Sequence, residues 1–267
     1  MLRTRLFCTI SIFLCALFSS RAQSLELQAV AYERIIYDGA SLDEVNSALM
    51  SKAECYMQLE RWREASETLA RVRVFALLPE ERKALQYKQE LCFFMSGEFA
   101  QAASFVSELE PDSKELLLLH ALALAYSGHY DESEIYAARY LCWDGESPYL
   151  PELYKLYAGH PRPRSEVASI LMSVVPPLGH IYNGEPAEGL LSAGMNAGAL
   201  AFTVANLLGG YWVTGIVGGA IALNYTIMGS QERNAALLEI YKHNAPLEFG
   251  DRLRAFLLNL NPVDPDA

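Results

Sequence analysis

The chain has 267 residues and a formal net charge of −11, and 52% of its residues are hydrophobic while 20% are charged. This length predicts one large domain or two smaller ones. An acidic chain repels the phosphate backbone of nucleic acids, so the composition argues against a nucleic-acid-binding protein.

The N-terminus has the three regions of an export signal. Arg3 and Arg5 form the positive region, residues 6–18 form the apolar region, and small residues precede a cleavage position after Ala22. We therefore expect a signal peptide over residues 1–22 and an exported protein. The alternative interpretation is an uncleaved membrane anchor.

Cleavage there would remove three arginines and no acid, which changes the net charge to −14. The cysteines that remain are Cys55, Cys92 and Cys142, which are widely spaced and odd in number. They match neither a metal-binding spacing nor a disulfide framework. We expect small core residues, with at most one adventitious disulfide, and neither a metal site nor a cofactor.

A pattern recurs three times between residues 41 and 143. Each copy has an apolar helix end, a short polar turn, an aromatic residue and, three residues later, a small residue. The aromatic residues are Trp62, Phe99 and Tyr130, and the small residues are Ala65, Ala102 and Ser133. The copies are 37 and 31 residues apart, which averages 34.

This period and these residues, together with Tyr56 in the first copy, resemble the tetratricopeptide repeat. The second copy departs from the pattern, because its apolar stripe fits only with a shorter turn. The resemblance implies an α-solenoid over residues 23–160 that binds protein along a concave groove. The alternative is a helical bundle in which the repeat is only structural.

Prolines and glycine in residues 159–166 end this region and mark a boundary. The apolar blocks 189–208 and 211–228 follow, separated by two glycines, and each is long enough for a bilayer core of about 30 Å. We expect a transmembrane helical hairpin within a domain at 161–231. A buried soluble hairpin is the alternative, and it would need a covering layer on every side.

Small residues occur at helical spacing within the hairpin. Gly194 and Gly198 are four residues apart, and so are Gly215 and Gly219. Close backbone approach drives helix association in lipid, so we expect these glycines to pack helices together. Asparagine is costly in lipid, and we expect Asn196, Asn206 and Asn224 to face the helix contact.

The segment PPLGHIYNG precedes the hairpin. It resembles P-G-x-G-x-x-Y-x-G, a signature of bacterial membrane proteins that introduces a hydrophobic hairpin and often follows tetratricopeptide-like repeats. The residues of this turn motif are Pro176, Pro177, Gly179, Tyr182, Asn183 and Gly184. Pro177 departs from the glycine of the signature, and proline fixes φ and removes a donor.

His180, Asn183, Glu185 and Glu188 are the clustered polar residues beside the apolar blocks. A histidine and two carboxylates can bind a metal or transfer protons, but this spacing matches no known motif. Polar groups that complete a turn explain them better, so we expect no enzyme. Alanine substitution without effect would exclude catalysis.

Residues 232–267 return to mixed charge, and Leu237, Leu238 and Tyr241 form a stripe typical of a short amphipathic tail helix. Export places the repeats outside the cytoplasm, on the periplasmic side. The positive-inside rule favours the opposite orientation, because Arg162, Arg164 and other basic residues flank the blocks. The complete export signal decides between them.

Together these features predict a membrane-tethered scaffold or adaptor of the bacterial cell envelope. Its partners would be envelope proteins and membrane lipid. The second hypothesis is an accessory subunit for membrane-protein insertion or transport that acts through the hydrophobic hairpin.

Overall fold

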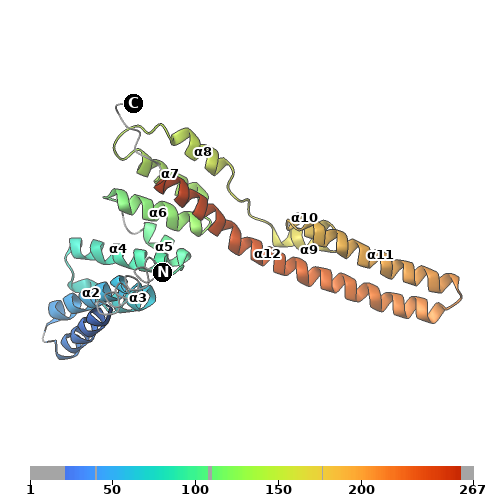
Figure 1. The fold of residues 1–267 in the computed structure, drawn as a ribbon, viewed down its shortest axis with the longest axis horizontal. Coiled ribbons are helices and arrows are strands. Elements are labelled where there is room, and N and C mark those ends of the chain that lie inside the picture. The colour runs from blue at the N-terminus through green and yellow to red at the C-terminus, as the bar shows by residue number, and fades with distance from the viewer. Residues whose placement is uncertain (1–21, 40, 108–109, 176, 260–267) are drawn as a thin grey trace, which may run out of the picture. The chain divides into compact units, whose positions relative to one another are not determined.

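The structure is a computed structural model that describes residues 22–39, 41–107, 110–175 and 177–259. Every regular element in these ranges is helical, which confirms the expected all-α class (Figure 1). The chain forms two compact units, Met1–Ala158 and Gly159–Ala267. The expected signal peptide lies outside the described residues, apart from its last residue.

In the first unit, residues 22–38 are helical and a series of helices follows. These helices are α2 Leu42–Gln58, α3 Trp62–Leu69, η1 Val74–Ala76, α4 Pro79–Met95, α5 Phe99–Ser104, η2 Phe105–Ser107, α6 Lys114–Tyr126, α7 Tyr130–Leu141 and α8 Leu150–Ala158. From α2 to α8, each α-helix contacts the next one in the chain.

Serine side chains fix where α2 and α6 begin. The hydroxyl oxygen of Ser41 accepts a hydrogen bond from the backbone N–H of Glu44 at 3.2 Å, which caps α2. Ser113 caps α6 in the same way by accepting from Leu116 N–H at 3.2 Å. These bonds satisfy backbone donors that a helix start leaves without a partner.

The turns within the three helix pairs share one backbone geometry. Glu60, Gly97 and Gly128 adopt positive φ angles of 58°, 82° and 86°. The residue after each donates its N–H to a carbonyl five residues earlier, as in the bond from Glu98 N–H to the Phe93 oxygen at 2.8 Å. This is a Schellman-type helix end, and it normally uses glycine because a Cβ is strained at positive φ.

The small residues that follow each turn are fully buried. Ala65, Ala102 and Ser133 have no exposed surface. Ser133 is polar, and its hydroxyl donates to the Ala121 carbonyl at 2.6 Å and lies 2.7 Å from the Tyr157 hydroxyl. A larger side chain at these positions would separate the paired helices, because packed interiors leave little free volume.

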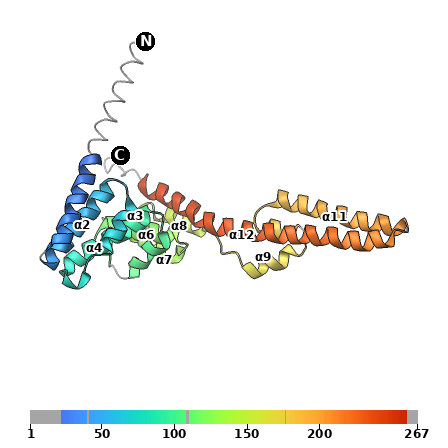
Figure 2. The same cartoon turned by 90° about the horizontal axis from the view of Figure 1, so that it is seen from below.

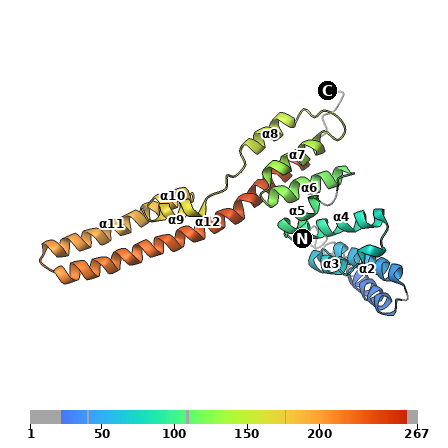
Figure 3. The same ribbon diagram turned by 180° about the vertical axis from the view of Figure 1, so that it is seen from behind.

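The described residues of the second unit form five further elements. They are α9 Glu166–Ser173, α10 Leu178–Tyr182, α11 Pro186–Leu208, the π-helix η3 Thr214–Gly218 and α12 Gly219–Leu258. After a short turn, α12 returns antiparallel beside α11, and the two helices lie side by side in Figure 1, Figure 2 and Figure 3. The Schellman-type turn recurs here at Gly184 and Gly210, with φ of 87° and 79°.

The end of the chain differs from the prediction of a separate short tail helix. Residues 232–258 continue α12, which runs without interruption from Gly219 to Leu258. No glycine cap ends the helix near residue 232, and the apolar side chains of Leu237 and Leu238 are buried in the extended helix.

Candidate functional site

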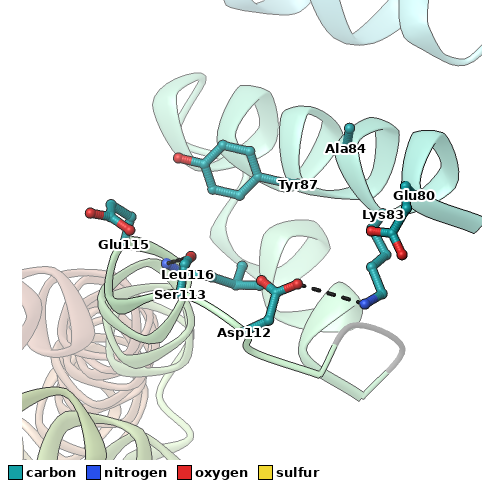
Figure 4. Close-up of a pocket in the computed structure, with 8 residues that line it drawn as sticks. All are labelled: Glu80, Lys83, Ala84, Tyr87, Asp112, Ser113, Glu115 and Leu116. Carbon is teal, nitrogen blue, oxygen red and sulfur yellow. Dashed lines mark hydrogen bonds and ion pairs between the residues drawn. The ribbon is translucent and has the colours of Figure 1, made fainter. Parts of the chain in front are cut away.

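A groove lies between α4 and the start of α6 in the first unit (Figure 4). Its volume is about 390 Å³, and it is lined by Glu80, Lys83, Ala84, Tyr87, Asp112, Ser113, Glu115 and Leu116. The N-cap at Ser113 fixes the first turn of α6 and so positions Glu115 and Leu116 beside α4.

The groove carries a net negative charge. Glu80, Asp112 and Glu115 supply carboxylates, and Lys83 supplies one ammonium group, which lies 3.6 Å from the Asp112 carboxylate. Tyr87 is half-buried, and burial followed by the nearby charge of Glu115 raises its pKa. The surface therefore suits a basic ligand with an apolar or aromatic component.

A buried ionisable pair lies further along the same two helices. His120 Nε2 lies 3.1 Å from Glu90 Oε2, and both side chains have no exposed surface. Burial raises the pKa of Glu90, because the charged carboxylate loses its hydration. Nothing in the sequence pattern indicated that His120 and Glu90 form a pair, because they are 30 residues apart.

The apolar part of the second unit exposes large apolar side chains. On α11, Leu190 is 73% exposed and Leu208 is 85% exposed. The buried positions on the same helix are Gly189, Ser192 and Ala199, which are small. Water-soluble helices have the reverse arrangement. Among the described residues, α11 is the one helix that is long and apolar enough to cross a bilayer.

The second predicted span, residues 211–228, does not form one regular α-helix. The helical part begins at Trp212, continues as the π-helix η3 and then becomes the first part of α12. Within it, the backbone of Gly215 comes close to α11, because a Cβ there would lie 3.0 Å from a Leu207 methyl carbon. Periodicity gave no indication of the π-helix.

The four glycines of the helix-packing prediction lie in two different environments. A Cβ at Gly219 would lie 2.1 Å from Thr203 Oγ1, so the helices approach closely there, as they do at Gly215. At Gly194 and Gly198, a Cβ would meet no atom within 4 Å. These two glycines therefore make no close contact between α11 and α12.

The three asparagines of the apolar region also lie in different environments. Asn196 faces the helix contact, where its Oδ1 accepts a hydrogen bond from the Thr226 hydroxyl at 2.9 Å. Asn206 donates to the Phe202 carbonyl of its own helix at 2.8 Å. Asn224 is exposed, contrary to expectation, because it falls on the outer face of α12.

The turn motif forms the junction of four helices. Gly179 has no room for a side chain, because a Cβ would lie 2.6 Å from Asn234 Nδ2 and 2.7 Å from Ser173 Cα. The Tyr182 hydroxyl accepts from the backbone N–H of Ser165 at 2.9 Å, and this ties α10 to the start of α9. Gly184 supplies the positive φ that ends α10.

Asn183 and Asn234 are the centre of this junction. Asn183 Nδ2 donates to Ser169 Oγ at 2.9 Å and to the backbone oxygen of Asn234 at 3.1 Å. Asn234 Nδ2 in turn lies 3.3 Å from His180 Nδ1, which must accept because an amide nitrogen only donates. His180 and Asn183 thus both take part in the hydrogen bonds of this junction.

The other motif residues frame this junction. Pro177 precedes α10 at its N-cap position with φ of −96°, and its carbonyl accepts from Ile181 N–H at 3.1 Å. Pro176 lies outside the described residues. Glu185 precedes α11, and Glu188 forms a two-bond ion pair with Arg233 at 2.7 and 2.8 Å.

Two negative findings apply to the described part of the chain. It contains no group of three or more His, Cys, Asp or Glu side chains placed to hold a metal ion. Its cysteines Cys55, Cys92 and Cys142 are all free thiols.

Comparisons with protein-family models, with curated proteins and with solved structures found no match to this chain. Function is therefore inferred from the geometry of the two units.

Proposed function

We propose that the protein is a membrane-tethered protein-interaction scaffold or adaptor of the bacterial cell envelope. In this proposal, residues 23–160 form a tetratricopeptide-like α-solenoid, and a transmembrane helical hairpin within 161–231 anchors it. Export through the N-terminal signal places the solenoid on the periplasmic side. The protein acts by binding and has no enzymatic activity.

The observation that supports membrane insertion most directly is the reversed polarity of the α11–α12 pair. Between residues 189 and 230, the two helices expose leucine, isoleucine, valine and aromatic side chains around their contact and bury glycine, alanine and serine. Moving one large apolar side chain from water into an apolar phase gains about 1.5–3 kcal/mol. The pair therefore gains stability in hydrocarbon, where no water competes for these surfaces.

The acidic groove between α4 and α6 supports the binding role. In a tetratricopeptide-like array, the first helix of each pair lines the concave face, and α4 and α6 are the first helices of their pairs. A basic extended segment of an envelope protein fits the carboxylates of Glu80, Asp112 and Glu115. The half-buried Tyr87 ring adds an apolar contact.

Flotation of the full chain with phospholipid vesicles tests the anchor. We expect the chain to float with the vesicles and to remain with them after washing with alkaline carbonate. Recovery of the chain in the supernatant would contradict insertion.

Site-specific crosslinking in native envelopes tests the groove. A photoreactive residue at Ala84, which is an exposed lining position, is expected to give a discrete adduct with a partner. The matched position is Glu67, which is exposed on α3 outside the groove and is expected to give none. Identical adducts at both positions, or none at either, would overturn groove binding.

The open glycines support a second candidate, an accessory subunit for membrane-protein insertion or transport. Gly194 and Gly198 leave free space on α11, where a transmembrane helix of another protein can approach closely. Leucine at both positions is expected to preserve the fold and to abolish copurification of a membrane partner. Unchanged copurification would exclude this candidate.

A further inference from the structure

A second groove runs along the α11–α12 contact near the motif junction. Its volume is about 440 Å³, and its lining includes His180, Ser192, Met195, Tyr225 and Ser230. All of its lining residues belong to the second unit. It shares no lining residue with the acidic groove between α4 and α6.

The floor of this groove holds two hydroxyl groups that the protein leaves unsatisfied. Ser192 is 3% exposed and Ser230 is 6% exposed. Neither Oγ atom has a hydrogen-bond partner among the described residues. A buried hydroxyl without a partner costs free energy, so two such groups in one groove point to a ligand that accepts hydrogen bonds.

The register of the two helices fixes the order of the polar groups along the groove. The Glu188–Arg233 ion pair joins the helices at one end, and the Asn196–Thr226 hydrogen bond joins them two turns further along. Because α11 and α12 are antiparallel, Ser192 and Ser230 lie between those two links.

Apolar side chains line the groove beside the serines and beyond them. Leu191, Met195 and Tyr225 all line it, and all three are exposed. The acid–base pair thus lies nearest the motif junction, the hydroxyl donors follow it, and the apolar surface runs from Leu191, beside Ser192, outward to Met195 and Tyr225.

We propose that this groove binds one zwitterionic diacyl glycerophospholipid, an inference that rests on the proposed membrane insertion. The phosphate and the ammonium group of the lipid lie at Arg233 and Glu188. The two serine hydroxyls donate to the ester carbonyl oxygens, and the acyl chains follow Leu191, Met195 and Tyr225.

The chemistry of the lining selects this class of lipid. Glu188 and Arg233 carry opposite charges, which complements a zwitterionic headgroup better than a purely anionic one. Both side chains remain partly exposed while they are paired, so their outer faces can contact the headgroup. Ester carbonyls only accept hydrogen bonds, and serine hydroxyls can donate them.

Native mass spectrometry of the full chain in detergent micelles tests the proposal. The probes are dioleoyl phosphatidylethanolamine, its ether-linked analogue without ester carbonyls, and dioleoyl phosphatidylglycerol. We expect one tightly retained phosphatidylethanolamine, with the ether analogue bound about tenfold more weakly because two hydrogen bonds are lost. Equal retention of the diester and ether lipids, or preferential retention of the anionic lipid, would overturn the proposal.

Two sets of variants locate the site. The double variant Ser192→Ala/Ser230→Ala is expected to fold normally, because it removes no hydrogen bond within the protein. It is expected to bind the diester phosphatidylethanolamine and its ether analogue equally. Gly229→Leu places a side chain in open space on the groove floor and is expected to abolish retention. Gly198→Leu is the matched control, with equal space outside the groove lining, and is expected to retain the lipid.

Vesicle flotation separates this inference from the proposed anchor. All of these variants are expected to float, because none of them removes exposed apolar surface. If the wild type floats but shows no preference for the ester lipid, the lipid site is wrong and the anchor stands. If the wild type fails to float, both proposals fail.

Discussion

The side-chain amide of Asn183 donates a hydrogen bond to the backbone oxygen of Asn234, 51 residues further along the chain. This bond ties the turn motif to α12 at the point where α9, α10, α11 and α12 meet. Asn234 is 1% exposed, so its amide has no access to water as a substitute partner.

We expect Asn234→Ala to destabilise this junction by about 1–3 kcal/mol, because it leaves buried partners unsatisfied. The matched control is Asn224→Ala, which removes an exposed amide from the same helix. Hydrogen exchange of the full chain in detergent, followed on peptides from α10 and α12, measures the effect. Equal exchange in the two variants would contradict the structural role of Asn234.

Gly219→Ala is expected to loosen the α11–α12 contact. Its Cβ would overlap Thr203 Oγ1, and the backbone must move apart to accommodate it. Overpacking of this kind costs about 1–3 kcal/mol. Gly194→Ala is the control, because a Cβ there meets open space and alanine is the better helix former. A lower melting temperature in detergent for Gly219→Ala alone would bear this out, and equal melting temperatures would count against it.

Glu60→Gly is expected to stabilise the first helix pair. Glu60 has φ of 58°, where the equivalent positions Gly97 and Gly128 have glycine. Relief of the strain from a Cβ at positive φ is worth about 1 kcal/mol. The expected result is about fivefold slower hydrogen exchange in α2 and α3.

Gly97→Ala is the reverse test of the same turn geometry. Gly97 has positive φ, but no atom lies within 4 Å of its Cβ position, so only backbone strain opposes alanine. It should destabilise α4 and α5 by about 1 kcal/mol. For the α2–α3 turn, faster hydrogen exchange in Glu60→Gly than in the wild type would show that the backbone at Glu60 is not strained.

Glu90→Gln is expected to stabilise the first unit in a pH-dependent way. Burial raises the pKa of Glu90, so the folded state binds its proton more tightly than the unfolded state does. The free energy of unfolding of the wild type is then greatest below the ordinary glutamate pKa, and it falls as the pH rises above that value. Glutamine keeps an amide beside His120 and carries no charge at any pH.

The difference in the free energy of unfolding between Glu90→Gln and the wild type should therefore grow as the pH rises above the ordinary glutamate pKa of about 4. Urea denaturation of the full chain in detergent, with exchange of peptides from α4 and α6 as the local probe, measures it. Glu90→Leu is the comparison, because it removes the charge and also leaves His120 Nε2 without its partner. A constant difference between wild type and Glu90→Gln as the pH rises above that value would contradict the raised pKa.

The local sequence determined where several of the helices begin and end. Ser41 and Ser113 cap helices through bonds that reach three residues, and Gly97 and Gly128 end helices through their own φ angles. The low charge between residues 167 and 231 likewise marks the apolar part of the chain. Such signals act within one or two helical turns, so composition and spacing reveal them.

Only the tertiary structure decided which side chains meet. Glu90 reaches His120 across 30 residues and Asn183 reaches Asn234 across 51, and both pairs depend on the register of packed helices. The same register separates Gly219, which lies at a close helix approach, from Gly198, which lies in open space, although both occur in the same sequence pattern. Helical periodicity gives every residue a face, but the packing of whole helices decides which faces are opposed, because that depends on contacts summed over both helices.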